Sequence, residues 1–276
     1  MGRTINDAIK YMEDNLTEDI TLADISKAVN LSAFHFQRAF TLLTGTSPAE
    51  YLRKRRLSQA GSELAKGDGK VIDIAFKYCY DSPESFTKAF TRFHGVSPAQ
   101  AKKGEPIQFM SRYTVRITIE GGSIMEYKIE RLEEMDLLVH SKLFHAETSD
   151  TEIPKFWDEY YANEEYRKIP GYLGVCAQEK SGGDEFKYGI GCKVADIDGI
   201  PEGFEIIHIP EYDWAVFKCI GPSTEAIQDT WERIYKEWLP VSDYELIPDV
   251  DIENYLPGDP SSSDYVSEIC IPVQKR

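Results

Sequence analysis

An internal repeat limits the possible folds of this chain more than any other feature of its sequence. Asp24-Ile25, Phe36, Phe40 and Gly45-x-Ser47-Pro48 recur as Asp73-Ile74, Phe86, Phe90 and Gly95-x-Ser97-Pro98. The offset between matching residues is forty-nine before the first phenylalanine and fifty from it onward. The second copy therefore has one extra residue between its two expected helices. Two copies of one short unit predict a duplicated supersecondary structure.

Each copy is predicted to fold as a helix, a short turn and a second helix. In the first copy Thr21 is the expected N-cap of a helix through Val29. Ser32 then caps a second helix, in which Phe36 and Phe40 lie one turn apart on a single face. The second copy has the matching features at Ser82, Pro83, Phe86, Phe90 and Phe93. The repeat therefore predicts two helix-turn-helix units.

A new helix is expected after each unit. Gly45 and Gly95 occupy positions where a left-handed residue ends a helix. The segments Ser47-Pro48-Ala49-Glu50 and Ser97-Pro98-Ala99-Gln100 follow them, and both match a capping box with proline at the first helical position. The first new helix is expected over residues 48–65, with a length of roughly 27 Å. Such a rigid connector suits two reading units that enter successive major grooves, about 34 Å apart.

The charge is divided unevenly along the chain. The whole chain has a net charge of −16, which by itself argues against a nucleic-acid partner. Residues 1–104, however, contain 15 basic and 12 acidic residues, a net of +3, and the remainder contains 16 basic and 35 acidic residues, a net of −19. This asymmetry is typical of a nucleic-acid-binding domain joined to a domain with another role.

From residue 125 onward the sequence predicts strands alternating with helices, again as a repeat. The segment 135–139 resembles 212–216, the segment 156–161 resembles 230–235, and the segment 190–194 resembles 269–273. Each half is expected to be a strand, a helix and two further strands, which together form an α+β domain with pseudo-twofold symmetry. The predicted domains are residues 1–104 and 124–276, and the linker 105–123 includes a possible strand over 113–119.

Several classes of protein are excluded at this stage. The five cysteines are isolated, which argues against a disulfide framework or a zinc site, and the histidines form no metal-ligand pattern. No cofactor and no metal are predicted. No run of about 18 apolar residues is present for a membrane span, and the N-terminus lacks a signal-peptide core. We therefore expect a cytoplasmic protein.

The first hundred residues resemble the DNA-binding domain of the AraC/XylS regulators. The resemblance rests on Ala23-Asp24-Ile25-Ser26, Leu31-Ser32-x-x-His35-Phe36-Gln37-Arg38-x-Phe40, Gly45-x-Ser47-Pro48-x-x-Tyr51-Leu52-Arg53 and the same frame at 73–98. From about residue 125 the chain resembles GyrI-like effector-binding domains, through Tyr212-x-x-Ala215-Val216-Phe217, Trp231, Tyr235-x-x-Trp238-Leu239, Glu253-x-Tyr255 and Ser267-Glu268-Ile269-x-Ile271-Pro272-Val273. The resemblance implies transcriptional control through paired recognition helices and a pocket for lipophilic, often cationic compounds.

The DNA-binding candidates come from both repeats. In the first, Phe34, Gln37 and Arg38 lie off the core face and match the family's base-reading positions. Arginine recognises guanine and glutamine recognises adenine. The second recognition helix has one basic residue and either reads bases or contacts mainly the DNA backbone. In the run Arg53–Arg56, some side chains are expected to contact phosphates and others to pair with acids such as Glu50. The predicted set is Ser32, Phe34, Gln37, Arg38, Arg53, Ser82, Glu84, Ser85, Thr87 and Lys88, and the alternative is a solvated surface.

The ligand-binding candidates are one carboxylate and four aromatic residues. Glu268 shares a strand face with Val266 and Cys270, and a carboxylate in an apolar cavity would select a cationic ligand. Aromatic rings would add cation–π walls to such a site. The alternative is that the rings belong to the core and that Glu268 pairs with a lysine or arginine. The predicted set is Tyr172, Tyr188, Trp214, Trp238 and Glu268.

These features predict a ligand-controlled, sequence-specific transcriptional regulator that is not an enzyme. Its expected partners are double-stranded promoter DNA, a small effector and RNA polymerase. One alternative is a hydrolase of reactive lipophilic compounds, with Glu268 as a general base. Another is a ligand-free C-terminal domain whose negative charge attracts a basic protein. The sequence leaves the effector, the operator, the sign of regulation and the oligomeric state open.

Overall fold

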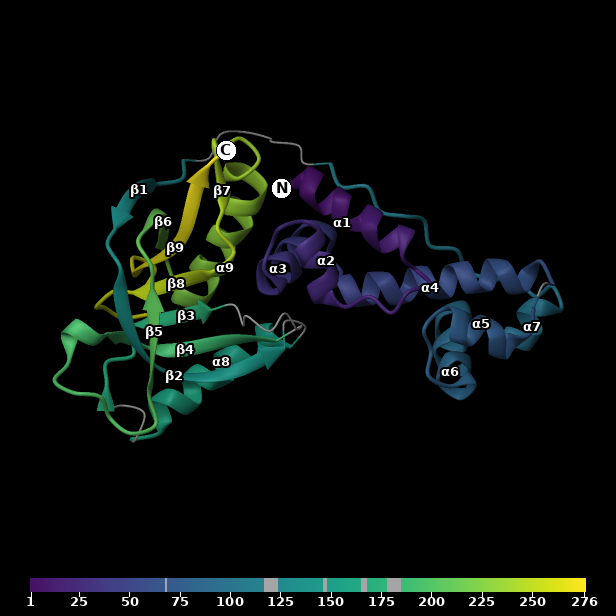
Figure 1. The fold of residues 1–276 in the computed structure, drawn as a ribbon, viewed down its shortest axis with the longest axis horizontal. Helices are drawn as coiled ribbons and strands as arrows, with labels where there is room; N and C mark the ends of the chain where they lie inside the picture. The colour runs from purple at the N-terminus through teal and green to yellow at the C-terminus, as the bar shows by residue number, and fades with distance from the viewer. Residues whose placement is uncertain (68, 117–123, 146–147, 165–167, 178–184) are drawn as a thin grey trace. The chain divides into compact units, whose positions relative to one another are not determined.

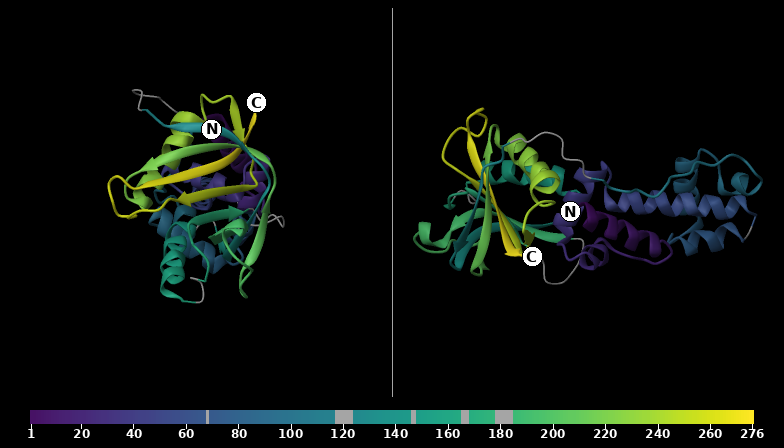
Figure 2. Two further views of the ribbon diagram at one scale, coloured as in Figure 1. Left: turned by 90° about the vertical axis from the view of Figure 1, so that its left-hand side faces the viewer. Right: turned by 90° about the horizontal axis from the view of Figure 1, so that it is seen from above.

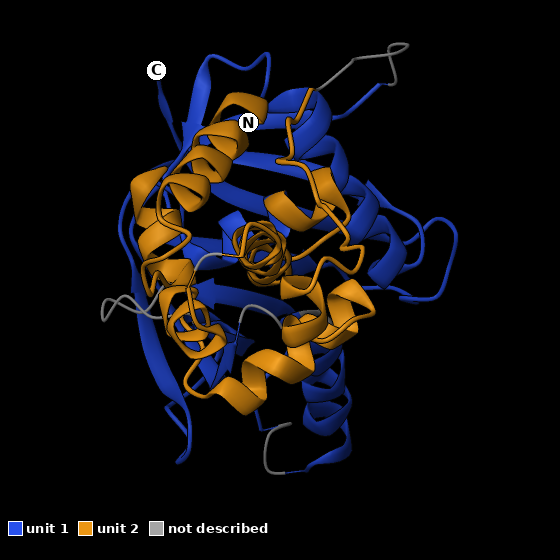
Figure 3. Cartoon of the chain, turned by 90° about the vertical axis from the view of Figure 1, so that its right-hand side faces the viewer, with its two compact units in different colours: residues 1, 30–39, 117–276 blue, residues 2–29, 40–116 orange. Residues whose placement is uncertain are grey.

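The computed structural model describes residues 1–276 except 68, 117–123, 146–147, 165–167 and 178–184. The chain divides into two compact units (Figure 3). The helical unit consists of residues 2–29 and 40–116, and the sheet unit consists of residue 1, residues 30–39 and residues 117–276. The division passes through one helix, α3 (Ala33–Thr44), whose first half belongs to the sheet unit.

The expected double helix-turn-helix pattern is confirmed by the helices that form. They are α1 (Gly2–Asp14), α2 (Leu22–Ala28), α3, α4 (Pro48–Ala65), α5 (Val71–Lys77), α6 (Pro83–His94) and α7 (Pro98–Lys102) (Figure 1). The first turn contains Asn30 at a φ of 54°, and the second contains Cys79 at a φ of 63°. One additional residue separates α5 from α6 compared with α2 and α3, as the change of repeat offset predicts.

Local capping explains where these helices begin. Thr21 and Asp24 form a complete capping box before α2, and Ser97 and Gln100 form another before α7. At α4, Ser47 accepts the Glu50 N–H at 3.2 Å as expected, but the Glu50 carboxylate instead pairs with Lys54 Nζ at 2.8 Å. The expected capping box at this helix is therefore only half formed, because a lysine one turn away competes for the carboxylate.

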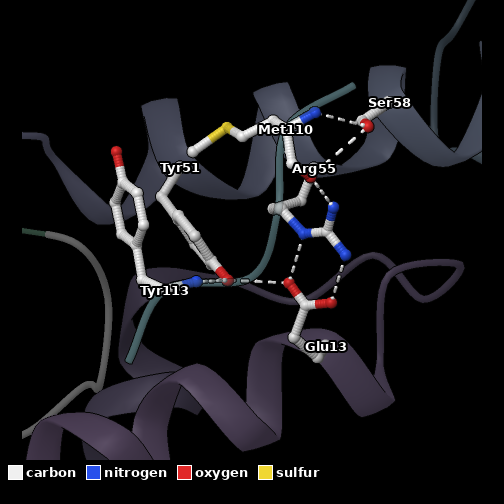
Figure 4. A network of polar contacts seen from close by, with 6 residues as sticks. All are labelled: Glu13, Tyr51, Arg55, Ser58, Met110 and Tyr113. Carbon is white, nitrogen blue, oxygen red and sulfur yellow. Dashed lines mark hydrogen bonds and ion pairs between the residues drawn. The ribbon is translucent and has the colours of Figure 1, made fainter. Parts of the chain in front are cut away.

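A buried ion pair connects α1 to α4 within the helical unit. Arg55 Nε and Nη2 each donate to a different oxygen of Glu13 at 2.7 Å (Figure 4). Tyr51 Oη also donates to the Glu13 carboxylate at 2.7 Å. The Arg55 side chain is 4% exposed. Arg55 is therefore structural, whereas Arg53 in the same basic run is 59% exposed.

Residues 105–116 form an irregular segment, so the strand expected over 113–119 is wrong for 113–116. Side chains, rather than a neighbouring strand, satisfy its backbone. Met110 N donates to Ser58 Oγ at 3.0 Å, and Tyr113 N donates to Tyr51 Oη at 3.4 Å (Figure 4). Val115 exchanges two hydrogen bonds of 2.8 and 2.9 Å with the Asn6 side chain. Residues 117–119 lie outside the described part of the chain.

The sheet unit is built on one antiparallel sheet. Its strands are β1 (Tyr127–Leu132), β2 (Met135–His145), β3 (Leu173–Ala177), β4 (Glu185–Lys193), β5 (Glu205–Ile209), β6 (Tyr212–Ile220), β7 (Tyr244–Leu246), β8 (Val250–Tyr255) and β9 (Val266–Lys275). Their order is β1-β6-β9-β8-β3-β4-β2-β5, and β7 pairs with β9. The helices α8 (Ser149–Ala162) and α9 (Ser223–Arg233), the latter continued by a π-helical turn over Ile234–Trp238, pack on the sheet (Figure 2).

The predicted pseudo-twofold arrangement is confirmed. The first half runs β2, α8, β3, β4 and the second runs β6, α9, β8, β9, and the halves meet where β3 pairs with β8. Strand register then sets the faces, because directly opposed residues in an antiparallel pair point the same way. Glu253 lies opposite Ile269, and Asn254 lies opposite Glu268. Within the described residues, no helix is both long and apolar enough to cross a membrane.

Candidate functional site

A cavity of about 450 Å³ lies between the sheet and its two covering helices. Trp157 of α8 and Ile227 of α9 contribute to its walls, and Tyr188 of β4 and Glu253 and Tyr255 of β8 contribute to its sheet side. The walls are therefore largely aromatic and apolar, and the carboxyl groups of Glu253, Asp251 and Asp158 are among them. This composition is typical of small-molecule sites.

The Glu253 carboxylate is held by three neutral donors. Trp231 Nε1 donates to Oε1 at 3.3 Å, and the hydroxyls of Tyr255 and Tyr188 donate to Oε2 at 3.0 and 3.3 Å. Trp157 Nε1 in turn donates to the Tyr188 hydroxyl at 3.0 Å. Burial, and then the charge of Glu253, raises the pKa of both tyrosine hydroxyls well above the ordinary value. Both hydroxyls thus stay protonated and stabilise the negative charge of the carboxylate.

The same cavity receives two side chains of α3. Phe34 and Arg38 both line it. The Arg38 guanidinium carbon lies 4.5 Å from the centroid of the Trp231 ring and 5.2 Å from that of Phe34. Arg38 Nη1 is 3.9 Å from Glu253 Oε1, and the two side chains are 11% and 12% exposed. A protein cation therefore occupies an aromatic and carboxylate environment of the kind that binds organic cations.

A third α3 side chain, that of His35, joins a buried polar cluster beside the cavity. His35 Nδ1 is 2.7 Å from the Tyr235 hydroxyl, and its Nε2 is 3.3 Å from Asp251 Oδ2. Burial, and then the charge of Arg38, lowers the pKa of His35 to about 3. Burial, and then the charge of Glu253, raises the pKa of Asp251 to about 8. At neutral pH the imidazole is therefore neutral and the Asp251 carboxyl is mostly protonated.

The predicted ligand residues are divided between two faces of the sheet. A second cavity of about 600 Å³ on the opposite face is lined by Trp214, Glu268 and Tyr172. Tyr172 also borders the helix-side cavity, which Tyr188 lines. Glu268 accepts a hydrogen bond from Asn254 Nδ2 at 2.9 Å, where a lysine or arginine partner was the expected alternative. The structure therefore brings Tyr172 and Tyr188, but not Trp214 and Glu268, to the cavity under the helices.

Trp238, the remaining predicted ligand residue, is placed in the core instead. Its ring packs edge-on against Phe217, with centroids 4.9 Å apart, and stacks on Tyr244 at 6.4 Å. Among the residues described, it lines neither of these two cavities. Trp238 is therefore a core residue, as the alternative to a ligand-binding role predicted.

Sequence reasoning missed Glu253 and Trp231 as site residues, although both were part of the resemblance. A signal was available in Glu253-x-Tyr255, because residues two apart in a strand share a face. An acidic and an aromatic residue on one strand face is the combination that a cation site needs. The link to Trp231 could not be read in this way, because it depends on how α9 packs on the sheet.

The first set of DNA-reading candidates is largely buried. Phe34 and Gln37 are each 8% exposed, and Ser32 is the N-cap of α3, where its Oγ accepts the His35 N–H at 3.1 Å. The Phe34 ring packs on Phe186 of β4, with centroids 4.5 Å apart. In this arrangement the side chains of α3 that were predicted to read bases contact the protein itself.

The second set lies on α6 and is largely exposed. Ser82 is the N-cap, and its Oγ accepts the Ser85 N–H at 3.1 Å. Glu84, Ser85, Thr87 and Lys88 are exposed, while Phe86 and Phe90 are fully buried on the other side of the helix. All five cysteines are free thiols, and no group of three potential metal ligands is found within the described residues.

Two family models match this chain. Residues 125–274 match the GyrI-like small molecule binding domain, and residues 25–104 match a helix-turn-helix domain. The HTH-type transcriptional activator AarP of Providencia stuartii is 39% identical over 95 residues, which are 34% of this chain and 70% of AarP. The transcriptional regulator Rob of Salmonella typhimurium is 24% identical over 289 residues, which span 98% of both chains.

Among solved structures, SAV2435 bound to tetraphenylphosphonium is similar to this chain. The two are 22% identical, the match covers 54% of this chain and 94% of SAV2435, and the TM-score is 0.48.

Proposed function

The chain belongs to the AraC-type helix-turn-helix transcriptional regulators with a C-terminal GyrI-like small-molecule-binding domain, and from this premise we propose that its ligand is a lipophilic cation bound at Glu253. Ligand-responsive DNA binding is the function of this type of regulator. The proposal concerns the chemical class of the ligand and the residues that hold it.

The observation that supports this proposal most strongly is the environment of Glu253. A buried carboxylate is costly unless hydrogen bonds or an opposite charge compensate it. Glu253 has three neutral donors, from Trp231, Tyr188 and Tyr255, and the guanidinium of Arg38 lies 3.9 Å from its carboxylate. Aromatic rings around a carboxylate favour a large cation with apolar substituents over a hydrated metal ion.

Calorimetric titration of the full chain with tetraphenylphosphonium tests the proposal. We expect saturable binding that falls at least tenfold in Glu253→Gln, because the substitution keeps the size of the side chain and removes its charge. Glu268→Gln is the matched control, since Glu268 lies on the other face of the sheet and is expected to leave the affinity unchanged. Equal affinity in the wild type and Glu253→Gln, or loss only in Glu268→Gln, would contradict the assignment.

For DNA, we propose that α6 and the exposed Arg53 supply contacts that are available without any rearrangement. Glu84, Ser85, Thr87 and Lys88 project from one exposed side of α6. The hydroxyls of Ser85 and Thr87 already bond to the backbone oxygens of Ser82 and Pro83 at 2.8 and 2.7 Å. This favours phosphate and van der Waals contacts over extensive base reading. A contact with RNA polymerase remains a prediction, which a pull-down on promoter DNA would test.

A further inference from the structure

The position of Arg38 suggests how the ligand pocket is regulated. Its guanidinium lies over the indole ring of Trp231, with a cation-to-centroid distance of 4.5 Å, and faces Glu253. Trp231 is fully buried, and its ring packs against both Arg38 and Tyr235. Arg38 therefore takes the place that the positive centre of a bound cation would take.

Neighbouring side chains hold this part of α3 against the sheet unit. Phe34 packs on Phe186, with ring centroids 4.5 Å apart, and His35 approaches both the Tyr235 hydroxyl and Asp251. Residues 30–39 accordingly form one compact unit with residues 117–276. The position of Arg38 is thus supported by the apolar and polar contacts of the helical turn that precedes it in α3.

We propose that Arg38 is a built-in occupant of the ligand pocket, and that a lipophilic cation binds by displacing it from Trp231 and Glu253. This inference rests on the proposed function, because it concerns the same pocket. Arg38 is also one of the base-reading candidates of the first helix-turn-helix unit. A guanidinium buried over Trp231 is unable to contact a guanine at the same time. Cation binding in the pocket therefore releases Arg38 for DNA.

Occupation of the pocket by Arg38 lowers the affinity for a cation. A ligand that binds only when Arg38 is out of the pocket has its affinity reduced by the fraction of molecules in that state. If Arg38 occupies the pocket in about nine-tenths of molecules, removing its charge tightens cation binding about tenfold. Linkage requires that the cation strengthen DNA binding by the same factor as DNA strengthens cation binding.

Chemical accessibility in the wild-type chain tests the displacement directly. Phenylglyoxal modifies accessible guanidinium groups, and mass spectrometry of the digested protein locates the adducts. Arg38 is expected to react slowly in the free protein and at least tenfold faster with saturating tetraphenylphosphonium. Two arginines of α4 provide internal standards, because the side chain of Arg53 is 59% exposed and that of Arg55 is 4% exposed. Their reactivities are expected to stay high and low, respectively.

Calorimetry of Arg38→Met with the same probe provides the second test. Methionine keeps an apolar side chain over Trp231 and removes the charge. We expect about tenfold tighter binding than in the wild type, and unchanged binding in the control Arg53→Met. Equal affinity in Arg38→Met and the wild type, or Arg38 that stays protected when the probe is bound, would overturn the displacement and leave the Glu253 site intact. If neither chain binds the probe, the cation site and the displacement both fail.

Discussion

Glu253 and Glu268 lie on the neighbouring strands β8 and β9, but their side chains point to opposite faces of one sheet. The register pairs Glu253 with Ile269 and Glu268 with Asn254. Glu253 therefore lies under the helices among Trp231, Tyr188 and Tyr255, whereas Glu268 accepts a hydrogen bond from the Asn254 amide. Because a shift of one position moves a side chain to the other face of a sheet, the strand register places Glu253 and Glu268 in two different cavities.

Trp231 is expected to matter for cation binding, and Trp238 is not. In Trp231→Phe the aromatic face is partly retained, but the indole N–H that donates to Glu253 is lost. We expect tetraphenylphosphonium to bind roughly tenfold more weakly, because a lost hydrogen bond to a charged group costs about 1.5–3 kcal/mol. Trp238→Phe is the matched control, since Trp238 packs on Phe217 and Tyr244. Calorimetry on both variants distinguishes them, and a comparable loss in Trp238→Phe would contradict the placement of the site.

The ion pair of Arg55 and Glu13 is expected to dominate the stability of the helical unit. Arg55→Met leaves a largely buried carboxylate without its partner, which costs about 3–5 kcal/mol. Arg53→Met, two residues earlier on the same helix but exposed, is expected to change stability by less than about 0.5 kcal/mol. Denaturant unfolding followed by far-ultraviolet circular dichroism checks both values. Equal stability of the two variants would contradict the structural role of Arg55.

Because of the ion pair of Arg55 and Glu13, the helical unit is expected to lose stability in acid. Burial raises the pKa of Glu13, but the hydrogen bonds from Arg55 and Tyr51 outweigh this effect and hold the pKa below its ordinary value of 4.5. A carboxyl group with a lowered pKa in the folded state stabilises the protein above its ordinary pKa, and this contribution disappears as the pH falls below it. The stability difference between the wild type and Glu13→Gln is therefore expected to be constant above pH 4.5 and to shrink below it.

The raised pKa of Asp251 is expected to give the stability of the sheet unit the opposite pH dependence. Its raised pKa of about 8 means that the folded state holds a proton that the unfolded chain releases near its ordinary pKa of 3.8, so stability falls as the pH rises toward 8. His35, with its pKa lowered from 6.5 to about 3, offsets this fall below pH 6.5. The net loss is therefore expected between pH 6.5 and pH 8, with a magnitude of roughly 1–2 kcal/mol.

Asp251→Asn is the variant that checks this assignment. The amide keeps the shape of the side chain and does not titrate, so the fall in stability above pH 6.5 is expected to be absent. Tryptophan fluorescence is a suitable probe, since Trp157, Trp214, Trp231 and Trp238 all belong to the sheet unit. An unchanged pH profile in the variant would assign the fall to another group.

Arg53 and Arg56 on α4 are expected to affect DNA binding differently. Arg53 is exposed, whereas Arg56 donates from Nε and Nη2 to the backbone oxygens of Leu16 and Glu18 at 3.0 and 2.6 Å. Arg53→Gln is therefore expected to lower the slope of log affinity against log salt by about one, as the loss of one phosphate contact does. Arg56→Gln is expected to keep the slope and lose stability. Fluorescence anisotropy with a duplex enriched from a random library measures the slopes.

Most of the helical unit could be predicted because its signals are local. Capping residues such as Thr21 and Ser97, and glycines such as Gly95 at a φ of 78°, determine helix ends through contacts only a few residues long. The alternation of strands and helices in the C-terminal half is also a local pattern. The strand expected at 113–119 is wrong for residues 113–116 because the side chains of Tyr51 and Asn6, far away in the sequence, bond to the backbone of Tyr113 and Val115.

The chemical character of the site could be predicted from the sequence, but its position on the sheet could not. The sequence indicates a carboxylate with aromatic neighbours, but Glu253 and Glu268 fit that description equally until strand register and the positions of α8 and α9 are known. The burial of Arg38 is harder still to foresee, because the local sequence around Arg38 does not indicate that Trp231 and Glu253 contact its guanidinium. Contacts between residues about two hundred positions apart leave no periodic pattern in a sequence.

The coupling between cation binding and DNA binding is tested most directly by the affinity of the full chain for an enriched DNA duplex. This affinity is measured with and without saturating tetraphenylphosphonium at fixed salt. We expect the cation to tighten DNA binding about tenfold in the wild type and to have no effect in Glu253→Gln. An affinity that does not change when the cation is bound, or that weakens, would contradict the proposed coupling between the pocket at Glu253 and DNA binding through Arg38.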